Sequence, residues 1–398
     1  QPPCIALTTK FAVLGLSGET HPNLLMQHAV PPAQQQQQPV AGAQGRRAMA
    51  STGPKIVVAA AADGGSSNKI GGDSFTERVK DPEWLKHRVQ VYDTIKERRA
   101  AELAQKVKVP ITVTMPDGTV IATNNNNGEP LEAWKTTPYD IAVGISQGLA
   151  DSATVTRVTY TKIVSEYDSK QNGMKGVDTL IDAMPDGGVE QQSSSSNEQQ
   201  VLLWDMTRPL VGNVSKLEFL KFENDTDAKT VFWHSSAHMM GEALEHEFGS
   251  KLTIGPPLAG GFYYDSYMDA LKEEDYKPIE THVNKIIKEK QKFERMVITK
   301  EEGLQLFSDN PFKVSILQTK VPDGGRTTVY RCGDLIDLCR GPHVMHTGKI
   351  KAFAATRHSA TYWLGDAEND SLQRLYGISF PDKKMLKVWR DNQEKVCS

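Results

Sequence analysis

The sequence predicts an α+β protein in which two folded modules follow a long, poorly structured N-terminal segment. A chain of 398 residues is too long for one ordinary hydrophobic core. Stretches with apolar residues at every second position, typical of half-buried strands, occur among stretches with apolar residues at helical spacing. Two polar regions of low complexity, 1–78 and 166–200, interrupt this pattern.

Residues 1–78 are rich in Ala, Gly, Gln and Ser and show no sustained periodicity, so we expect them to be disordered. Residues 1–62 contain a single acidic residue, Glu19. This acid-poor segment loosely resembles an organellar transit peptide. An unstructured leader is the equal alternative, and QQQQQP at 34–39 favours it. Because the first residue is Gln1, we expect a fragment, a processed form or an incomplete gene sequence.

The first predicted element is a long amphipathic helix over 81–106, within a leader-helix segment 79–107. Its apolar residues recur at helical spacing among many charges: Trp84, Val89, Tyr92, Ile95 and Leu103. Asp81 and Pro82 suit the N-cap and the first turn of such a helix.

The first module is predicted over 108–225. VPITVTMPDGTVIA at 109–122 indicates a β-hairpin, because two alternating apolar runs flank the turn sequence Pro-Asp-Gly. A short helix at 137–150 and a strand at 153–164 follow; after the polar insertion 166–200, strand patterning returns in VLLWDMTRPL and SKLEFLKFE. Two strands, a helix and two more strands are typical of a β-grasp domain, although any α+β fold of ubiquitin size fits the same pattern.

The second module is predicted over 226–390. It begins with a helix whose buried stripe is formed by Ala237, Met240, Leu244 and Phe248 and which ends at Gly249. The further elements predicted are strands within 252–268, a charged helix at 274–299, strands at 313–319 and 327–332, and a helix at 383–397.

Composition excludes several classes of protein. The net charge of −3 argues against a protein that coats nucleic acid through bulk electrostatics, although a local RNA site needs only one positive face. The four cysteines are too few and too scattered for a disulfide framework and fit a reducing compartment. No run of 18 apolar residues predicts a membrane span.

Two pairs of potential ligands share one spacing. His234 and His238 form HxxxH on the predicted helix, and Cys339 and His343 form CxxxH about a hundred residues later. Three imidazoles and a thiol have the composition of a tetrahedral zinc site, which is the most specific hypothesis from residue type alone. Gly341-Pro342 breaks any helix between the second pair, so four unrelated core or surface residues are the alternative. Four further histidines are expected to be surface residues and not ligands: His246, His282, His346 and His358.

Longer motifs resemble one family. HSSAH at 234–238, GPPLAGGFYYD at 255–265, YRCGDLIDLCRGPHVMHTGKIKAF at 330–353, TYWLGD at 361–366 and LQRLYGISFPD at 372–382 closely resemble the editing domain of threonyl-tRNA synthetases. VTMPDG, WKTTPYDIAVGISQGLAD and WDMTRPL resemble the family's N-terminal TGS module, a small β-grasp domain. The helix at 81–106 is similar to the leader helix of the eukaryotic cytosolic form. The resemblance covers about 80–398 and implies a larger α+β editing domain of the threonyl/alanyl second-additional-domain type after the TGS domain.

The resemblance implies hydrolysis of Ser-tRNA(Thr). Serine is threonine without one methyl group, and a missing methyl changes binding by only about 1–3 kcal/mol, so a threonine pocket admits serine too often. A second, smaller pocket corrects the error. In the family pattern its catalytic group falls on His234, Lys313, His238, Cys339 and His343, and its substrate-binding group on Tyr264, Asp337 and Arg340.

Within that pocket, His234, together with Lys313, is expected to activate a water, and Lys313 or a protonated imidazole to offset the oxyanion charge. Asp337 and Tyr264 are expected to bind the amino group or hydroxyl of serine. The cations expected to touch the tRNA end are Lys349, Lys351 and Arg357.

No cofactor is expected for editing, and zinc at the two ligand pairs becomes the minority hypothesis, because a metal is known on the equivalent groups only in the alanyl relatives. ATP and magnesium belong to the ligase domain, whose motifs the sequence lacks; residues 391–398 are expected to be a truncated linker. The parent enzyme is expected to be a cytoplasmic homodimer, with a mitochondrial or plastid form as the alternative. A non-catalytic module that binds tRNA or a partner and a zinc-dependent aminoacyl-ester hydrolase are the rival functions.

Overall fold

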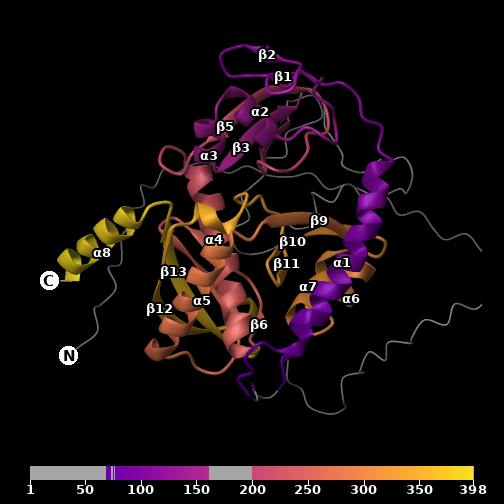
Figure 1. Ribbon diagram of the computed structural model, residues 1–398. Coiled ribbons are helices and arrows are strands. Elements are labelled where there is room, and N and C mark those ends of the chain that lie inside the picture. Colours follow the sequence, from indigo (N-terminus) through magenta and orange to yellow (C-terminus); the bar gives the residue numbers. More distant parts are fainter. Residues whose placement is uncertain (1–68, 73–74, 76, 161–199, 398) are drawn as a thin grey trace, which may run out of the picture. The chain divides into compact units, whose positions relative to one another are not determined.

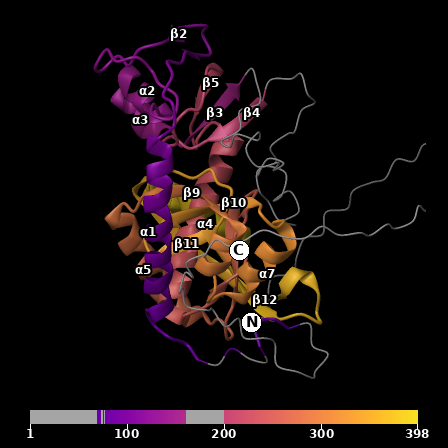
Figure 2. The ribbon, with the colours of Figure 1, turned by 90° about the vertical axis from the view of Figure 1, so that its right-hand side faces the viewer.

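The computed structural model describes residues 69–72, 75, 77–160 and 200–397, and those up to 396 belong to one compact unit. The predicted α+β class is confirmed, since helices surround three β-sheets in this part of the chain (Figures 1 and 2). Most of the predicted leader 1–78 and nearly all of the predicted insertion 166–200 lie outside the described residues. Among the described helices, none has the length and apolar character needed to span a membrane.

The first module forms a five-stranded sheet with the order β2-β1-β5-β3-β4. Its elements are β1 (Val113–Thr114), β2 (Val120–Ile121), α2 (Pro138–Ile145), α3 (Gln147–Ser152), β3 (Val155–Tyr160), β4 (Gln200–Trp204) and β5 (Val214–Leu220). β1 and β5 pair in parallel, and the other neighbours are antiparallel. The predicted helix at 137–150 is two helices, because Ser146 ends α2 and its side chain caps α3.

The second module contains two sheets, with the orders β11-β10-β9 and β12-β13-β8-β6, and β7 pairs with β8. Its elements are α4 (Thr226–Phe248), β6 (Lys251–Leu252), β7 (Pro257–Leu258), β8 (Gly261–Tyr267), α5 (Tyr276–Glu289), β9 (Phe293–Thr299), α6 (Lys300–Leu306), α7 (Pro311–Lys320), β10 (Arg326–Cys332), β11 (Leu335–Leu338), β12 (Ala352–Tyr362), β13 (Ser371–Phe380) and α8 (Lys383–Cys397). The predicted strand at 327–332 and helix at 383–397 are confirmed.

Two predicted elements of this module are wrong. The sequence predicts a strand at 313–319, but these residues lie in α7, whose first turn contains Pro311 and whose N–H groups at Phe312 and Lys313 donate to the side chain of Asn310. The sequence also predicts one helix over 274–299. The helix ends at Glu289, where Lys290 takes a left-handed conformation with φ of 53°, and β9 follows.

Helix α1 (Glu83–Ala104) confirms the predicted leader helix. Its N-cap is Pro82 and not Asp81, whose carboxylate instead lies 2.7 Å from Nδ1 of His246. α1 contacts α6, β9 and β11, so it packs on the second module although it precedes the first in the sequence (Figure 1).

Helix α4 is the central element of the second module. Asp225 caps its N-terminus, and the predicted stop at Gly249 is confirmed by a left-handed residue with φ of 64°. α4 contacts β8 and β13 of one sheet, β10 and β11 of the other, and α5 (Figure 1). Side chains on α4 can therefore meet residues from both sheets.

Candidate functional site

The two ligand pairs of the sequence meet in the structure. His234 and His238 lie one turn apart on α4, Cys339 directly follows β11, and His343 follows the cis Gly341–Pro342 peptide bond. One ring nitrogen from each histidine and Sγ of Cys339 all lie within 4.8 Å of one another. The structure thus forms one four-residue cluster, which a zinc site and a hydrolytic pocket both require.

Hydrogen bonds orient the cluster. Sγ of Cys339 lies 3.2 Å from Nε2 of His343 and 3.4 Å from Nε2 of His234. The hydroxyl of Ser235 donates to the carbonyl oxygen of Val231 and lies 3.0 Å from Nδ1 of His343. Because the hydroxyl has one proton, Nδ1 of His343 is the donor in that pair. Its Nε2 is therefore left as an acceptor for the Cys339 thiol.

Burial keeps the cluster uncharged. It lowers the pKa of His234 to about 3 and that of His238 to about 4, and the neighbouring His238 adds to the effect at His234. Burial also lowers the pKa of His343 well below its ordinary value and raises the pKa of the Cys339 thiol. At neutral pH the cluster consists of three neutral imidazoles and a thiol. His234 is its partly exposed member, so solvent reaches the cluster there.

A buried carboxylate lies next to the cluster. Asp337, on β11, has one oxygen 2.5 Å from Nζ of Lys313 on α7, and its other oxygen accepts a hydrogen bond from the hydroxyl of Tyr264 on β8. Burial acts to raise the pKa of Asp337, but the Lys313 cation and the hydrogen bonds bring it below its ordinary value. Nε2 of His238 lies 3.8 Å from the same carboxylate. Asp337 therefore connects three predicted pocket residues.

Asp205, Phe293 and Tyr330 complete the site and are not predicted from the sequence. Oδ1 of Asp205 accepts from the backbone N–H of His343, and Oδ2 accepts from the hydroxyl of Tyr330, each at 2.8 Å. The ring of Phe293 stacks on the imidazole of His343, with centroids 4.7 Å apart. The one sequence signal for Asp205 is its place at the end of the apolar run VLLWD, where an acid is unusual. In the structure Asp205 is 5% exposed.

Known proteins are similar to this chain in sequence. A family model described as "Threonyl and Alanyl tRNA synthetase second additional domain" matches residues 327–376. The chain is 42% identical over 324 residues to "Threonine--tRNA ligase, cytoplasmic" of Caenorhabditis elegans, a match covering 81% of this chain and 38% of that protein. It is 44% identical over 320 residues to "Threonine--tRNA ligase 1, cytoplasmic" of Homo sapiens, covering 79% and 37%. The chain is homologous to cytoplasmic threonyl-tRNA synthetases.

The homology confirms the resemblance read from the motifs, and the names of the relatives agree with the predicted cytoplasmic location. The chain spans less than two fifths of the length of these threonyl-tRNA synthetases. The family match at 327–376 extends from β10 into β13 and includes Asp337, Cys339 and His343.

Four further cations predicted from the threonyl-tRNA synthetase resemblance differ in exposure. Arg340 is partly buried, and Lys351 and Arg357 are exposed. Nζ of Lys349 donates to two carbonyl oxygens at the C-terminal end of α3, one of them that of Asp151 at 2.6 Å. Burial lowers the pKa of Lys349. Lys349 therefore joins the two modules, whereas Lys351 and Arg357 remain open to solvent.

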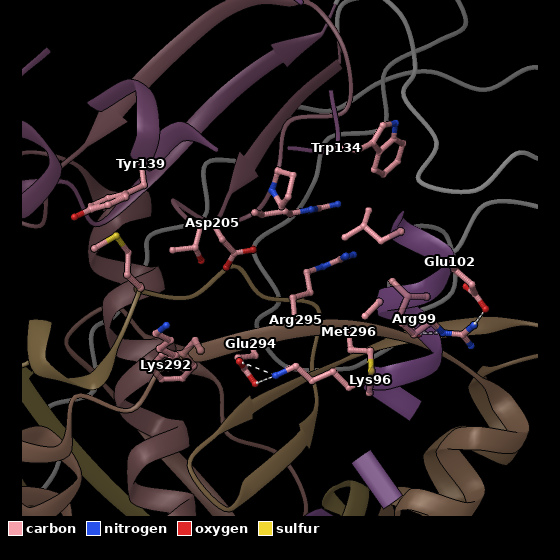
Figure 3. A pocket seen from close by; sticks show the side chains of 18 of the residues that line it. Lys96, Arg99, Glu102, Trp134, Tyr139, Asp205, Lys292, Glu294, Arg295 and Met296 are labelled. Atoms are coloured by element: carbon pink, nitrogen blue, oxygen red, sulfur yellow. Dashed lines mark hydrogen bonds and ion pairs between the residues drawn. The ribbon is translucent and has the colours of Figure 1, made fainter. Parts of the chain in front are cut away.

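Residues of α1, β9 and the first module line a groove of about 700 Å³, which we call the α1–β9 groove (Figure 3). The cationic residues that line it are Lys96, Arg99, Lys106, Arg208, Lys292 and Arg295. Three acids also line it, together with the aromatic rings of Trp134 and Tyr139, so its charge is net positive. Asp205 and Phe293 line the groove and both contact His343, which connects the groove to the cluster.

Proposed function

We propose that this chain carries the editing part of a threonine–tRNA ligase and hydrolyses mischarged Ser-tRNA(Thr). The observation that supports it is the cluster of neutral groups around the partly exposed His234, next to the buried Asp337. A neutral imidazole that water can reach is the form a general base requires. The homology to threonyl-tRNA synthetases supplies the aminoacyl ester as the bond to be cut.

In the proposed reaction, His234 takes a proton from a water as the water oxygen attacks the carbonyl carbon of the seryl ester. The bond from that carbon to the ribose oxygen then breaks, and the ribose oxygen leaves with a proton. The low pKa values of His234 and His238 mean that neither imidazole is charged before water attacks, and the proton that His234 takes up passes on to the leaving ribose oxygen, so another cation must offset the oxyanion. Lys313 is the remaining cation, although its contacts to Asp337 and to the carbonyl of Thr253 must loosen for it to serve.

The serine is proposed to lie beside Asp337 and Tyr264. The carboxylate is ionised and suits an α-ammonium group, and the phenol suits a hydroxyl. Both groups are rigidly held in the core, since Tyr264 is fully buried. A pocket with rigid walls excludes a larger side chain more sharply than it rewards a matching one, which is what rejection of threonine demands.

The first module is proposed to be the TGS-type β-grasp domain. Its mixed sheet pairs β1 with β5 in parallel, and Ile141 of α2 belongs to the core cluster formed by the strands. This is the arrangement expected for a small β-grasp fold, with the sequence motifs of the TGS module in β1, α2 and the loop after β4.

The α1–β9 groove is proposed to bind the single-stranded end of the tRNA. Cationic side chains suit phosphates, and aromatic rings such as Trp134 offer a face on which bases stack. Lys106 lies 5.0 Å from the centre of the Trp134 ring, so charge and stacking surface are adjacent. We likewise propose that the parent enzyme is a homodimer and that it uses ATP and magnesium to charge tRNA.

We propose that editing needs no metal. The four-residue cluster has the donor set of a zinc site, and a zinc-dependent ester hydrolase is therefore the competing proposal. A bound zinc would supply a polarised water there. Deacylation that survives exhaustive chelation supports the metal-free reaction, whereas loss of activity that zinc restores contradicts it.

The decisive experiment is a deacylation assay with Ser-tRNA(Thr) and Thr-tRNA(Thr). We expect the chain to hydrolyse the seryl ester preferentially and His234→Ala to lower the rate by about 10²–10⁴, the range for loss of a general base. His358→Ala, which removes a histidine on β12, is the matched control and should act as wild type. Unchanged hydrolysis by His234→Ala, or binding of tRNA without any turnover by the wild type, would contradict the proposal; the latter result fits a non-catalytic module.

A further inference from the structure

A second group of potential ligands lies farther along α4. Glu242 and His246 follow His238 at the same spacing of four residues, so they continue the ridge that begins with the cluster. His282 on α5 meets them: one ligand atom from each of the three residues lies within 4.8 Å of the others. The sequence predicts His246 and His282 as surface residues. This prediction is wrong for His282, which is 9% exposed. His246 is partly buried, with 13% of its side chain exposed, and it pairs with the carboxylate of Asp81.

Both histidines of this group are oriented by carboxylates. Nδ1 of His246 lies 2.7 Å from Oδ1 of Asp81, and Nδ1 of His282 lies 2.9 Å from Oε1 of Glu247. With Nδ1 engaged in both rings, Nε2 is the nitrogen through which each ring would bind an ion. Nε2 of His246 lies 3.5 Å from Oδ2 of Asp334, and although burial opposes it, the hydrogen bonds to Asp334 and Asp81 raise the pKa of His246 to about 9, so an ion must displace a proton from this ring. Metal-binding histidines are commonly held in this way, with the second ring nitrogen donating to a carboxylate that fixes the tautomer and the ring plane.

Glu242 supplies an observation independent of the histidines. It is 3% exposed; its Oε1 accepts from Nε2 of Gln291 at 2.9 Å, and its Oε2 has no hydrogen-bond partner among the described residues. A buried carboxylate oxygen without a partner is unfavourable, and burial raises the pKa of Glu242 to about 8. A cation beside Oε2 would remove this cost. A candidate for a fourth ligand is near, since Oδ2 of Asp334 lies 3.5 Å from Nε2 of His246.

We propose that Glu242, His246 and His282 bind a divalent transition-metal ion, with Asp334 or a water as the fourth ligand. Two imidazoles with one or two carboxylates suit zinc, and the nitrogen ligands disfavour magnesium and calcium. The ion would join α4 to α5 and, through His246, to the segment before α1. The site is structural in this proposal and does not depend on the editing reaction.

The test is zinc and cobalt(II) binding by the metal-free full chain, measured by calorimetry and absorption. His282→Gln and Glu242→Gln are each expected to remove one bound zinc and the accompanying rise in melting temperature. Cys339→Ser is the matched control, because it alters only the other cluster and should leave this zinc bound. Cobalt at this site should give weak d–d bands without the intense near-ultraviolet band of a thiolate ligand.

Three results would overturn the proposal. The first is a wild-type chain that binds no zinc at micromolar concentration. The second is a zinc content that neither His282→Gln nor Glu242→Gln lowers. The third is a cobalt spectrum with a thiolate band and a single bound ion that Cys339→Ser abolishes, because the metal would then lie in the cluster of Cys339. The cobalt spectrum needs only wild-type protein, so a variant that fails to fold does not weaken the test.

Discussion

Neutral histidines are the property on which the site's chemistry depends at the scale of single residues. An imidazole with an ordinary pKa near 6.5 is partly protonated in a slightly acidic solution and then cannot accept a proton from water. Burial lowers the pKa of His234 to about 3 and that of His238 to about 4. The proposed base is therefore unprotonated at any physiological pH. The same low pKa makes His234 a weak base, so it would orient the water and deprotonate it only partly.

The pH dependence of deacylation tests this state. Because the pKa of His234 lies below 6.5, the neutral base persists on acidification until the pH approaches its folded-state value. We expect kcat/KM for Ser-tRNA(Thr) to stay level from about pH 8 to about pH 5 and to fall only below that range. Spontaneous ester hydrolysis, measured without protein, is subtracted at each pH. A profile with its midpoint near 6.5 would assign catalysis to an imidazole that burial has not perturbed.

Asp205 is the residue that ties the cluster to the first module. Its two oxygens accept from the N–H of His343 and from the Tyr330 hydroxyl, and replacement by asparagine removes the charge and one acceptor. We expect Asp205→Asn to reduce stability by about 1.5–3 kcal/mol, the range for a hydrogen bond to a charged group, and to slow deacylation. Denaturant unfolding and the deacylation assay measure the two effects. Asp117→Asn, in an exposed turn, is the control. If both substitutions change stability and the deacylation rate equally, Asp205 does not position the cluster.

At the scale of elements, the sequence predicts what local patterns encode. The HxxxH and CxxxH motifs predict His234 and Cys339 as site residues, because a ligand pair has a fixed spacing. Gly249 likewise predicts the end of α4. Asp205 carries no such mark: it meets His343 across 138 residues of chain, and only the tertiary structure brings them together. The sequence prediction misses helix α7 for another reason. Its capping signals are local, but the β-branched residues after Lys313 favour a strand and outweigh them in the prediction.

The cap of α7 has a measurable consequence. Asn310 is 1% exposed; its oxygen accepts from the N–H groups of Phe312 and Lys313, and its amide donates to the carbonyl oxygen of Leu252. Asn310→Ala leaves these groups without partners in the core, so we expect a loss of about 1–3 kcal/mol in the free energy of unfolding. Ser146→Ala removes the exposed cap of α3 and should cost less. Equal losses would show that burial of the cap is immaterial.

The whole molecule depends on how α1 is anchored. The guanidinium of Arg88 lies in the core, 2.9 Å from a carboxylate oxygen of Glu245 on α4 and 2.7 Å from one of Asp309. All three groups are largely removed from water, and Arg88 also lies over the ring of Trp84. Lys251 also pairs with Asp309, at 3.3 Å, but Arg88 is the cation that α1 supplies. Displacement of α1 would leave the buried carboxylate of Glu245 without its cation, so α1 has few alternative positions.

Removal of this cation should therefore destabilise the second module as a whole. Arg88→Ala leaves the carboxylate of Glu245 buried without its cation and leaves Asp309 with Lys251 alone, and we expect a loss of about 3–5 kcal/mol in the free energy of unfolding, measured with urea. Lys86→Ala, on the same helix, removes an exposed pair with Glu83 and should change stability by less than about 1 kcal/mol. Because α1 packs on β9, which also lines the α1–β9 groove, Arg88→Ala should weaken tRNA binding as well. If Arg88→Ala matches Lys86→Ala in both measurements, the buried pairs of Arg88 do not anchor α1.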